Sequence, residues 1–433
     1  MSIVTVGSTN PAFSFVIQKN PATIRESNIP FKRSVRKGVV NGWFTKPDDS
    51  EFRLWFKDHD HQSSFAEGLS DEFEYLDRSR YGSPYAPIAI ITECLGSASK
   101  EESALDLPGS LFESYISSNI LVANPSFLER MSSHYNDSCL IKAEPLPGQE
   151  RYAKITVTAP TLHSAINIFQ TLCIMQALSD KETYVPMGEA ALQKFAKVFN
   201  RANAPYYPRY LFKVRAIHNR ATFDKVKEDL QGAGTTFVFG DTRQQRFDVI
   251  REQLKVKPSE VLYDIGCGEM FYALRLQNTY ETIFAIDADE EISTNNVGKL
   301  RGRNIEDVVA IHAMVDKEWV EENGEKFSGA DILLTEVLEH IPQEESLVLL
   351  DQILKCNPSK VVITVPNKDF NVNYGITENE TRHYDHKWEP TFADFSDEMV
   401  TVAAATGYKV SVTPIGDIVN DASVSTLAVF IKE

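Results

Sequence analysis

The chain has 433 residues, of which 42% are hydrophobic and 24% charged, a composition that predicts a globular protein of about two or three domains. Its formal net charge of −17 excludes broad, nonspecific nucleic-acid binding, because neutralising phosphates needs clustered Lys and Arg. A small site that holds only the end of a strand remains compatible with this charge. No stretch approaches about 18 uninterrupted apolar residues and the N-terminus lacks a signal-peptide pattern, so we expect no membrane association. The five cysteines are widely spaced without a CxxC pair, which argues against a structural zinc site or a disulfide framework and favours the cytoplasm.

The first half of the chain alternates short β-like runs with helical stretches. Residues 83–95 form a turn followed by an apolar element, residues 155–161 a strand, and residues 162–179 a buried, amphipathic helix. The "GAG" at 232–234 marks a change of pattern. We therefore predict an α+β N-terminal domain over residues 1–230 and a second domain over residues 231–433.

The second half has a clearer rhythm of strands and helices. Predicted strands cover 260–266, 281–289, 307–315, 329–336, 359–367, 408–416 and 425–433, and predicted helices cover 243–254, 269–277 and 344–355. Alternating strands and helices predict an α/β fold with a doubly wound, seven-stranded sheet, and the last two strands, with no helix between them, predict an antiparallel hairpin at its edge. In such a sheet, ligands bind outside the carboxyl ends of the strands.

A glycine turn follows the first strand of this sheet. The stretch "YDIGCGEM" contains Asp264, Gly266 and Gly268, and Asp287 ends the next strand. Glycines let a backbone approach a ligand closely, and an acid at the second strand can accept hydrogen bonds from both ribose hydroxyls of an adenosine. A dinucleotide site would need a third glycine where Phe271 stands. The pattern instead resembles class I (Rossmann-like) S-adenosylmethionine-dependent methyltransferases, with Gly268 and the other three residues at the donor pocket; a glycine turn without a ligand is the alternative.

The fourth strand of the sheet ends in "TEVLEH". If one helical turn begins there, Glu336, Glu339 and His340 share a face, and Pro342 limits that turn. Two carboxylates and an imidazole suit Mg²⁺ or Mn²⁺ better than zinc. Taken alone, such a turn is more often the solvated start of a helix.

A second cluster follows the fifth strand, where His383 and His386 flank Asp385. Three ordered motifs resemble those of the small-RNA 3′-terminal ribose 2′-O-methyltransferases: E-V-x-E-H at 336–340, P-N-x-x-[FY]-N at 366–371 and D-H-[KR]-[FW]-E at 385–389. The resemblance covers about residues 240–433. It departs from the family at Met270, where a glycine is usual, and at Pro390, where a Trp is usual.

The resemblance implies a role for each matching residue. The ligands of a divalent metal, Mg²⁺ or Mn²⁺, would be Glu336, Glu339, His340 and His386. The S-adenosylmethionine pocket would be lined by Asp264, Gly266 and Asp287. Arg382 would contact the RNA end, with Lys368 and Lys387 near the last phosphates.

The implied chemistry is metal-assisted methylation of a ribose 2′-OH. A metal that holds the 2′- and 3′-oxygens lowers the pKa of the 2′-OH and requires a free 2′,3′-diol at the RNA end. A neutral imidazole accepts the proton. His383 is one candidate base, and His340 or His386 could combine this role with metal binding.

Bacterial members of the family carry a large domain before the methyltransferase, as this chain does. In them it pairs with a polynucleotide kinase-phosphatase/ligase, which implies a role in RNA repair. Two other functions stay open at this stage. One is methylation of another hydroxylated substrate, and the other is a non-catalytic assembly subunit of a repair complex.

Overall fold

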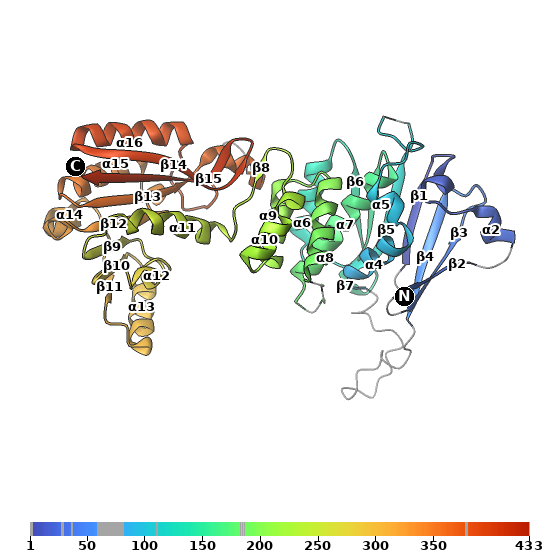
Figure 1. Cartoon of the computed structure of the whole chain (residues 1–433), viewed down its shortest axis with the longest axis horizontal. Helices are drawn as coiled ribbons and strands as arrows, with labels where there is room; N and C mark the ends of the chain where they lie inside the picture. Colours follow the sequence, from blue (N-terminus) through green and yellow to red (C-terminus); the bar gives the residue numbers. More distant parts are fainter. Residues whose placement is uncertain are drawn as a thin grey trace. The chain divides into compact units, whose positions relative to one another are not determined.

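The computed structural model describes residues 3–26, 30–35, 38–58, 82–109, 111–181, 183, 185, 187–376 and 380–432. The chain divides into two compact units, Met1–Gly232 and Ala233–Glu433, coloured blue to green and green to red in Figure 1. The boundary predicted after residue 230 lies two residues before this division. No helix in the described part of the chain is long and apolar enough to cross a membrane.

The first unit contains an antiparallel sheet with the strand order β2-β3-β4-β1-β5-β7-β6 among the described residues. Its strands are β1 (Ile3–Ser8), β2 (Phe31–Val35), β3 (Gly38–Phe44), β4 (Glu51–Asp58), β5 (Ser114–Leu121), β6 (Leu140–Leu146) and β7 (Gln149–Ala159). Its helices are α1 (Phe13–Val16), α2 (Pro21–Glu26), α4 (Tyr85–Cys94), α5 (Gly96–Lys100), α6 (Pro125–Tyr135), α7 (Leu162–Ser179), α8 (Glu189–Arg201), α9 (Tyr206–Ala216) and α10 (Arg220–Leu230). The predicted α+β character of this half is confirmed.

Helix α7 is the central helix of the first unit. Its first residue follows Thr161, whose side chain caps the helix by accepting from Ser164 N, and its bounds equal the predicted ones. It packs against β5 and β7 on one side and against α4, α8 and α9 on others. Because it is covered from several sides, even its polar residues Asn167 and Gln176 are buried, and both are hydrogen-bonded.

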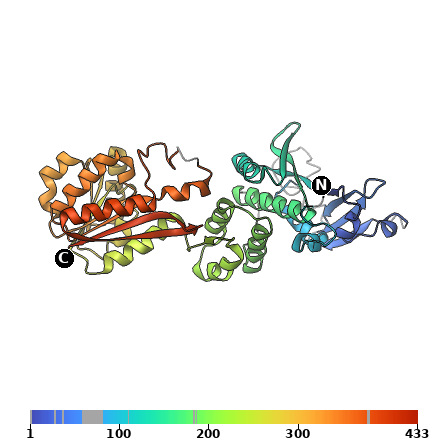
Figure 2. The same cartoon turned by 90° about the horizontal axis from the view of Figure 1, so that it is seen from above.

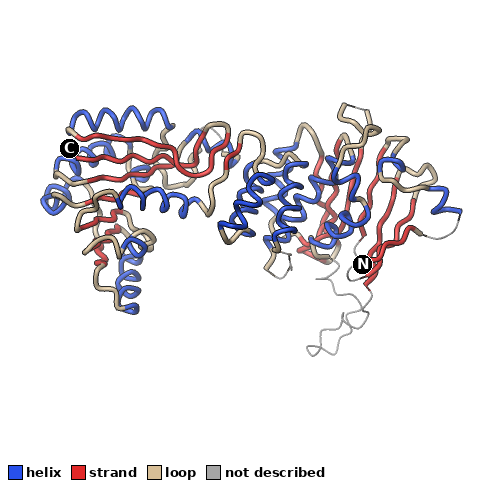
Figure 3. The backbone as a smooth tube through the Cα atoms, viewed as in Figure 1, coloured by secondary structure: helices blue, strands red, loops and turns tan. Residues whose placement is uncertain are grey.

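The second unit is the predicted doubly wound sheet, with the order β11-β10-β9-β12-β13-β15-β14-β8 among the described residues. Its strands are β8 (Thr235–Thr236), β9 (Val261–Ile265), β10 (Thr282–Asp287), β11 (Val308–His312), β12 (Asp331–Thr335), β13 (Lys360–Pro366), β14 (Tyr408–Val419) and β15 (Ala422–Lys432). The first five strands after β8 are parallel, and β15 joins β13 antiparallel. The seven predicted strands and their closing hairpin are confirmed, and the two-residue β8 adds an eighth at the edge (Figure 3).

Helices cover both faces of this second sheet. They are α11 (Thr242–Lys255), α12 (Ala273–Leu276), α13 (Glu290–Arg303), α14 (Lys317–Asn323), α15 (Gln343–Lys355) and α16 (Phe392–Thr406), with 3₁₀ turns η1 (Gly324–Phe327), η2 (Leu338–His340) and η3 (Lys368–Tyr374). Figure 2 shows α16 along the β14–β15 hairpin, which it contacts. The helix predicted over 269–277 was too long, because Gly268 and Met270 have positive φ and delay the helix until Ala273.

The strands of the sheet centre are apolar throughout because both of their faces are buried. In β12, Ile332 and Leu334 join the core under α14, α15 and α16. Leu333, on the opposite face, joins the core under α11 and α12. Packing on both faces holds β12 in place within the sheet. It therefore also positions Glu336, which follows the end of this strand.

Candidate active site

The turn after β9 closes over the end of β10. The backbone N–H groups of Gly266 and Cys267 both donate to the carbonyl of Ile286, at 2.8 and 3.0 Å. Gly266 has φ +70°, and a Cβ there would lie 2.5 Å from Cγ2 of Val337. Only glycine fits this position, because any side chain would collide with the segment that follows β12.

One carboxyl group, that of Asp264, precedes this turn in the sequence, and another, that of Asp287, follows it. Asp264 is fully buried, and burial raises its pKa to about 7. Asp287 is partly exposed; its Oδ2 accepts from Gly268 N at 2.7 Å and its Oδ1 from Asp289 N at 3.0 Å. The four residues predicted for the methyl donor thus converge on one turn, while their contacts with a donor stay a prediction.

Asn296 of α13 also holds this turn and was missed by the sequence analysis. Its buried side-chain amide donates to Gly268 O at 2.7 Å. This bond fixes the carbonyl of Gly268, whose N–H is bound by Asp287. A single Asn inside a helix carries no sequence signal for such a role.

The end of β12 turns sharply at Glu336. This residue has φ +54°, and η2 begins two residues later, so the expected helical turn shared by Glu336, Glu339 and His340 was wrong for Glu336. Its backbone N–H still pairs with Thr364 O at 2.9 Å, as an extension of the sheet. The strand pairing therefore reaches Glu336, the last residue of the predicted strand.

The Glu336 carboxylate faces Arg246 of α11. Its Oε2 forms an ion pair with Arg246 Nη1, and its Oε1 accepts from Thr364 Oγ1 at 3.1 Å. Both side chains are largely buried, 26% exposed for Glu336 and 14% for Arg246. Glu336 raises the pKa of Arg246 against the opposing effect of burial. Sequence reasoning missed Arg246, because helical periodicity could only place it beside the apolar face of α11.

Three predicted metal ligands meet next to this pair. Glu339, His340 and His386 each offer a ligand atom, and these atoms lie within 4.8 Å of one another. Glu339 is fully buried, and within the described part of the chain neither of its carboxylate oxygens has a hydrogen-bond partner. Burial, and then the nearby Glu336, raise its pKa well above the usual range. A buried carboxylate without donors, next to two imidazoles, fits a divalent cation.

Carboxylates orient the three histidines of the site. His386 Nδ1 lies 2.5 Å from Glu389 Oε1, and His340 Nδ1 lies 3.0 Å from Asp385 Oδ2. His383 Nδ1 bonds the other oxygen of Asp385. Each pairing assigns the ring proton to Nδ1 and leaves the Nε2 lone pair for a metal or for a proton.

Backbone and indole contacts join the two segments that carry these groups. Lys387 N donates to Glu339 O at 2.7 Å. Trp388 Nε1 donates to Leu338 O at 2.9 Å, across 50 positions of sequence. The loop after β13 is therefore fixed on η2, which brings His386 to Glu339.

Arg382 belongs to the same loop. Its Nε donates to Asn371 Oδ1 at 2.6 Å, its Nη1 to Val424 O at 2.7 Å, and its Nη2 to Asn367 O. Asn371 in turn donates to Glu389 Oε2 at 2.6 Å. The guanidinium that was predicted to contact the RNA end is thus engaged in anchoring the loop, and burial lowers its pKa.

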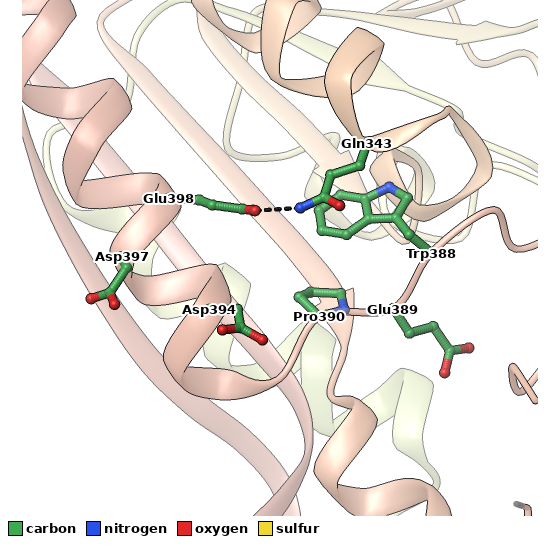
Figure 4. Close-up of a pocket in the computed structure, with 7 residues that line it drawn as sticks. All are labelled: Gln343, Trp388, Glu389, Pro390, Asp394, Asp397 and Glu398. Atoms are coloured by element: carbon green, nitrogen blue, oxygen red, sulfur yellow. Dashed lines mark hydrogen bonds between the residues drawn. The ribbon is translucent and has the colours of Figure 1, made fainter. Parts of the chain in front are cut away.

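Residues 388–390 also line a cavity of about 390 Å³. Figure 4 shows its lining residues: Gln343, Trp388, Glu389, Pro390, Asp394, Asp397 and Glu398. The Glu389 carboxylate points away from the other acids, toward His386. The departure at Pro390 therefore alters the surface behind the site and leaves the cluster of Glu339, His340 and His386 intact.

Comparison with known proteins places the chain in a family. Residues 3–235, more than half of the chain, match the family described as the Hen1 N-terminal domain. The small RNA 2′-O-methyltransferase of Caenorhabditis elegans is 26% identical over 147 residues, which are 30% of this chain and 33% of that protein. The chain thus spans about a third of the length of this curated relative.

The similar solved structures include a chain of an RNA repair complex and a methyltransferase domain. A chain of the Pnkp1/Rnl/Hen1 RNA repair complex is 22% identical, with a TM-score of 0.77 over 99% of this chain and 100% of that one, so the two share a fold. The methyltransferase domain of bacterial CtHen1 is 25% identical over 44% of this chain and 100% of that one, with a TM-score of 0.36. The family resemblance predicted from the sequence is confirmed, and the chain belongs to the Hen1 N-terminal domain family.

Proposed function

We propose that the chain transfers a methyl group from S-adenosylmethionine to the 2′-OH of the 3′-terminal ribose of RNA, with Mg²⁺ or Mn²⁺ as cofactor. The observation that carries this proposal is the buried Glu339 carboxylate, which lacks hydrogen-bond donors within the described residues and meets His340 and His386. The glycine turn proposed for the methyl donor lies against Val337, two residues before Glu339. Donor and acceptor would therefore be held side by side at one edge of the sheet.

The acceptor hydroxyl must lose a proton while it attacks the methyl group. A divalent cation bound by Glu339, His340 and His386 would supply the positive charge that makes the 2′-OH easier to ionise. We assign the proton to Nε2 of His383, since Asp385 binds its Nδ1 and fixes the ring. The 2′-oxygen bonds the methyl carbon, the sulfonium–methyl bond breaks, and S-adenosylhomocysteine leaves.

Glu336 has two possible positions in the proposed mechanism, beside Arg246 or beside the cation. It was predicted as a fourth ligand, and it would have to exchange its partner Arg246 for the cation to act as one. In either position its charge adds to that of Glu339. Two carboxylates repel a 3′-phosphate, which explains why we expect the enzyme to require a free 3′-OH.

Arg382 is better described as a positioning residue than as an RNA contact. Its side-chain bond to Asn371, and the bond from Asn371 to Glu389, form a chain that ends at His386. We propose that this chain sets the angle of the His386 ring.

We further propose that the protein acts in RNA repair in the cytoplasm, with a kinase-phosphatase/ligase partner bound by the first unit. Family membership of residues 3–235 and the shared fold with the Hen1-containing repair complex support this proposal. Methylation would then protect a mended 3′ end against a second cut.

The test is methyl transfer from labelled S-adenosylmethionine to a short RNA in the presence of Mn²⁺ or Mg²⁺. The matched substrates end in a 2′-deoxy residue or in a 3′-phosphate. We expect transfer only to the 2′,3′-diol, and none with a chelator. Labelling that ignores the RNA end would refute the proposal and point to another hydroxylated substrate, and donor binding without any transfer would point to an assembly subunit.

A further inference from the structure

A cluster of two arginines around one phenylalanine, Arg243, Phe271 and Arg275, is not used by the reaction described above. The guanidinium carbon of Arg275 lies 3.8 Å from the centre of the Phe271 ring, and that of Arg243 lies 5.2 Å from it. Arg275 also donates from Nη1 to Phe271 O at 3.1 Å. Both arginines are exposed, while Phe271 is partly buried against Phe247. The aromatic ring therefore holds two cations in fixed places on the surface.

The two cations lack acidic partners. Among the described residues, neither Arg243 nor Arg275 has a carboxylate oxygen within 4.0 Å, although the chain has a net charge of −17. Arg251 gives a direct contrast on the same helix. It lies 5.5 Å from the ring of Phe247 but is paired with Asp248 at 3.7 Å and Glu252 at 3.3 Å. Of these three described arginines, Arg243 and Arg275 remain available to an anion, whereas Arg251 is already paired with acids.

The cluster lies at the same edge of the sheet as the candidate active site. Arg243 precedes Arg246 by one turn of α11, and Arg246 binds Glu336 at the end of β12. Phe271 directly follows the glycine turn that closes over β9 and β10. The cluster thus adjoins both the arginine that binds Glu336 and the proposed methyl-donor turn.

We propose that Arg243 and Arg275, held by Phe271, bind backbone phosphates of single-stranded RNA upstream of its 3′-terminal nucleotide. This inference rests on the proposed function and adds a second contact to it. Guanidinium groups match phosphate oxygens with paired N–H donors, and groups already fixed on a ring lose little conformational freedom on binding. A local cationic contact also explains how an acidic protein retains a polyanionic substrate.

The test compares the Arg243→Gln/Arg275→Gln double variant with the wild type and with Arg251→Gln as the matched control. Methylation is measured on a 20-nucleotide RNA and on a dinucleotide, each with a free 3′-diol. We expect KM for the long RNA to rise about tenfold in the double variant, with kcat retained. The slope of the logarithm of RNA affinity against the logarithm of salt concentration should become shallower by about 1.4. This is the change expected when two phosphate contacts to a single strand are lost. Arg251→Gln should behave as the wild type.

The outcomes separate this inference from the function on which it rests. An unchanged KM for the long RNA in the double variant would overturn the inference while wild-type methylation upholds the function. Weaker binding of S-adenosylhomocysteine, measured by calorimetry, with RNA binding retained would assign the arginines to the donor and also overturn it. Absence of 3′-end methylation by the wild type would refute the function itself.

Discussion

The turn after β9, proposed to bind the methyl donor (the donor turn), and the cluster of Glu339, His340 and His386, proposed to bind a metal (the metal cluster), are held in place by different means. The donor turn is held mainly through backbone atoms, with Gly266 N on Ile286 O and Gly268 N on Asp287. The cluster is held mainly by side chains, with His340 on Asp385 and His386 on Glu389, beside one backbone bond from Lys387 N to Glu339 O. We therefore expect substitutions at the cluster to change chemistry more than folding, and substitutions near the turn to do the reverse.

The largest effect is expected from Glu339→Ala. Loss of the buried carboxylate removes a proposed metal ligand, and methyl transfer should fall at least about 1,000-fold, the equivalent of several kcal/mol of transition-state stabilisation. Calorimetric titration with Mn²⁺ measures the accompanying loss of metal binding. Glu344→Gln, an exposed acid on α15, is the control. Retained Mn²⁺ affinity in Glu339→Ala would remove the cluster from the mechanism.

The sequence predicted these two halves unequally well, for a physical reason. The donor turn is local: Asp264, Gly266 and Gly268 stand within five positions, and their backbone requirement can be recognised directly. The cluster could be assembled only through the motif resemblance, because the contact of Trp388 with Leu338 spans 50 positions.

Other features of the site had no sequence signal. Glu336 has a left-handed conformation, and its pairing with Arg246 depends on how α11 packs on β14 and β15. The anchoring bonds of Arg382 likewise depend on the approach of the β15 carbonyl at Val424. Periodicity and motifs place a residue on an element, and these contacts are decided by tertiary packing.

Near the donor turn, we expect the buried Asp264 to make the free energy of unfolding depend on pH. Asp264 has its pKa raised from 3.8 to about 7 in the folded protein, so the unfolded chain releases this proton first as pH rises. Protonated Asp264 therefore contributes to the free energy of unfolding below about pH 4. This contribution, on the order of 4 kcal/mol, is lost as the pH rises from about 4 to 7. Asp264→Asn should flatten this part of the pH dependence. Urea unfolding of the second unit at pH 5 and pH 7.5 gives the comparison, and an equal slope in both proteins would contradict it.

His383→Gln tests the chemistry of the cluster without removing a proposed metal ligand. If His383 accepts the proton, kcat should fall about 100-fold while Mn²⁺ affinity is kept. His312→Gln, at the end of β11 on the same sheet, is the matched control because that histidine is exposed and binds only Ala288 O among the described residues. An unchanged kcat in His383→Gln would move the base to another group.

Arg246→Gln tests a residue that is close to both regions. Its helix, α11, packs beside the donor turn, and its side chain binds Glu336. Removing one partner of a largely buried ion pair leaves the other charge uncompensated, and we expect about 2 kcal/mol less stability. Mn²⁺ should restore part of this loss if the released Glu336 turns to the cation. Thermal unfolding with and without Mn²⁺ measures both effects, and Arg251→Gln, a more exposed arginine of the same helix, should show neither. A loss that Mn²⁺ does not reduce would mean that Glu336 stays outside the metal site.

The smallest effect is expected at Tyr384, where the cluster meets solvent. Its side chain is 93% exposed, and its ring lies 4.5 Å from that of His383, centre to centre, with an interplanar angle of 36°. An exposed aromatic ring beside His383, the proposed proton acceptor, can stack on a base whatever its identity, and one such contact contributes about 1 kcal/mol. Tyr384→Ala should therefore weaken RNA binding about fivefold, whereas Tyr384→Phe should bind as the wild type does. Fluorescence anisotropy with a labelled 3′-diol RNA measures the affinities. If Tyr384→Phe weakens binding as much as Tyr384→Ala, the hydroxyl rather than the ring contacts the RNA, and recognition at this rim depends on hydrogen bonding.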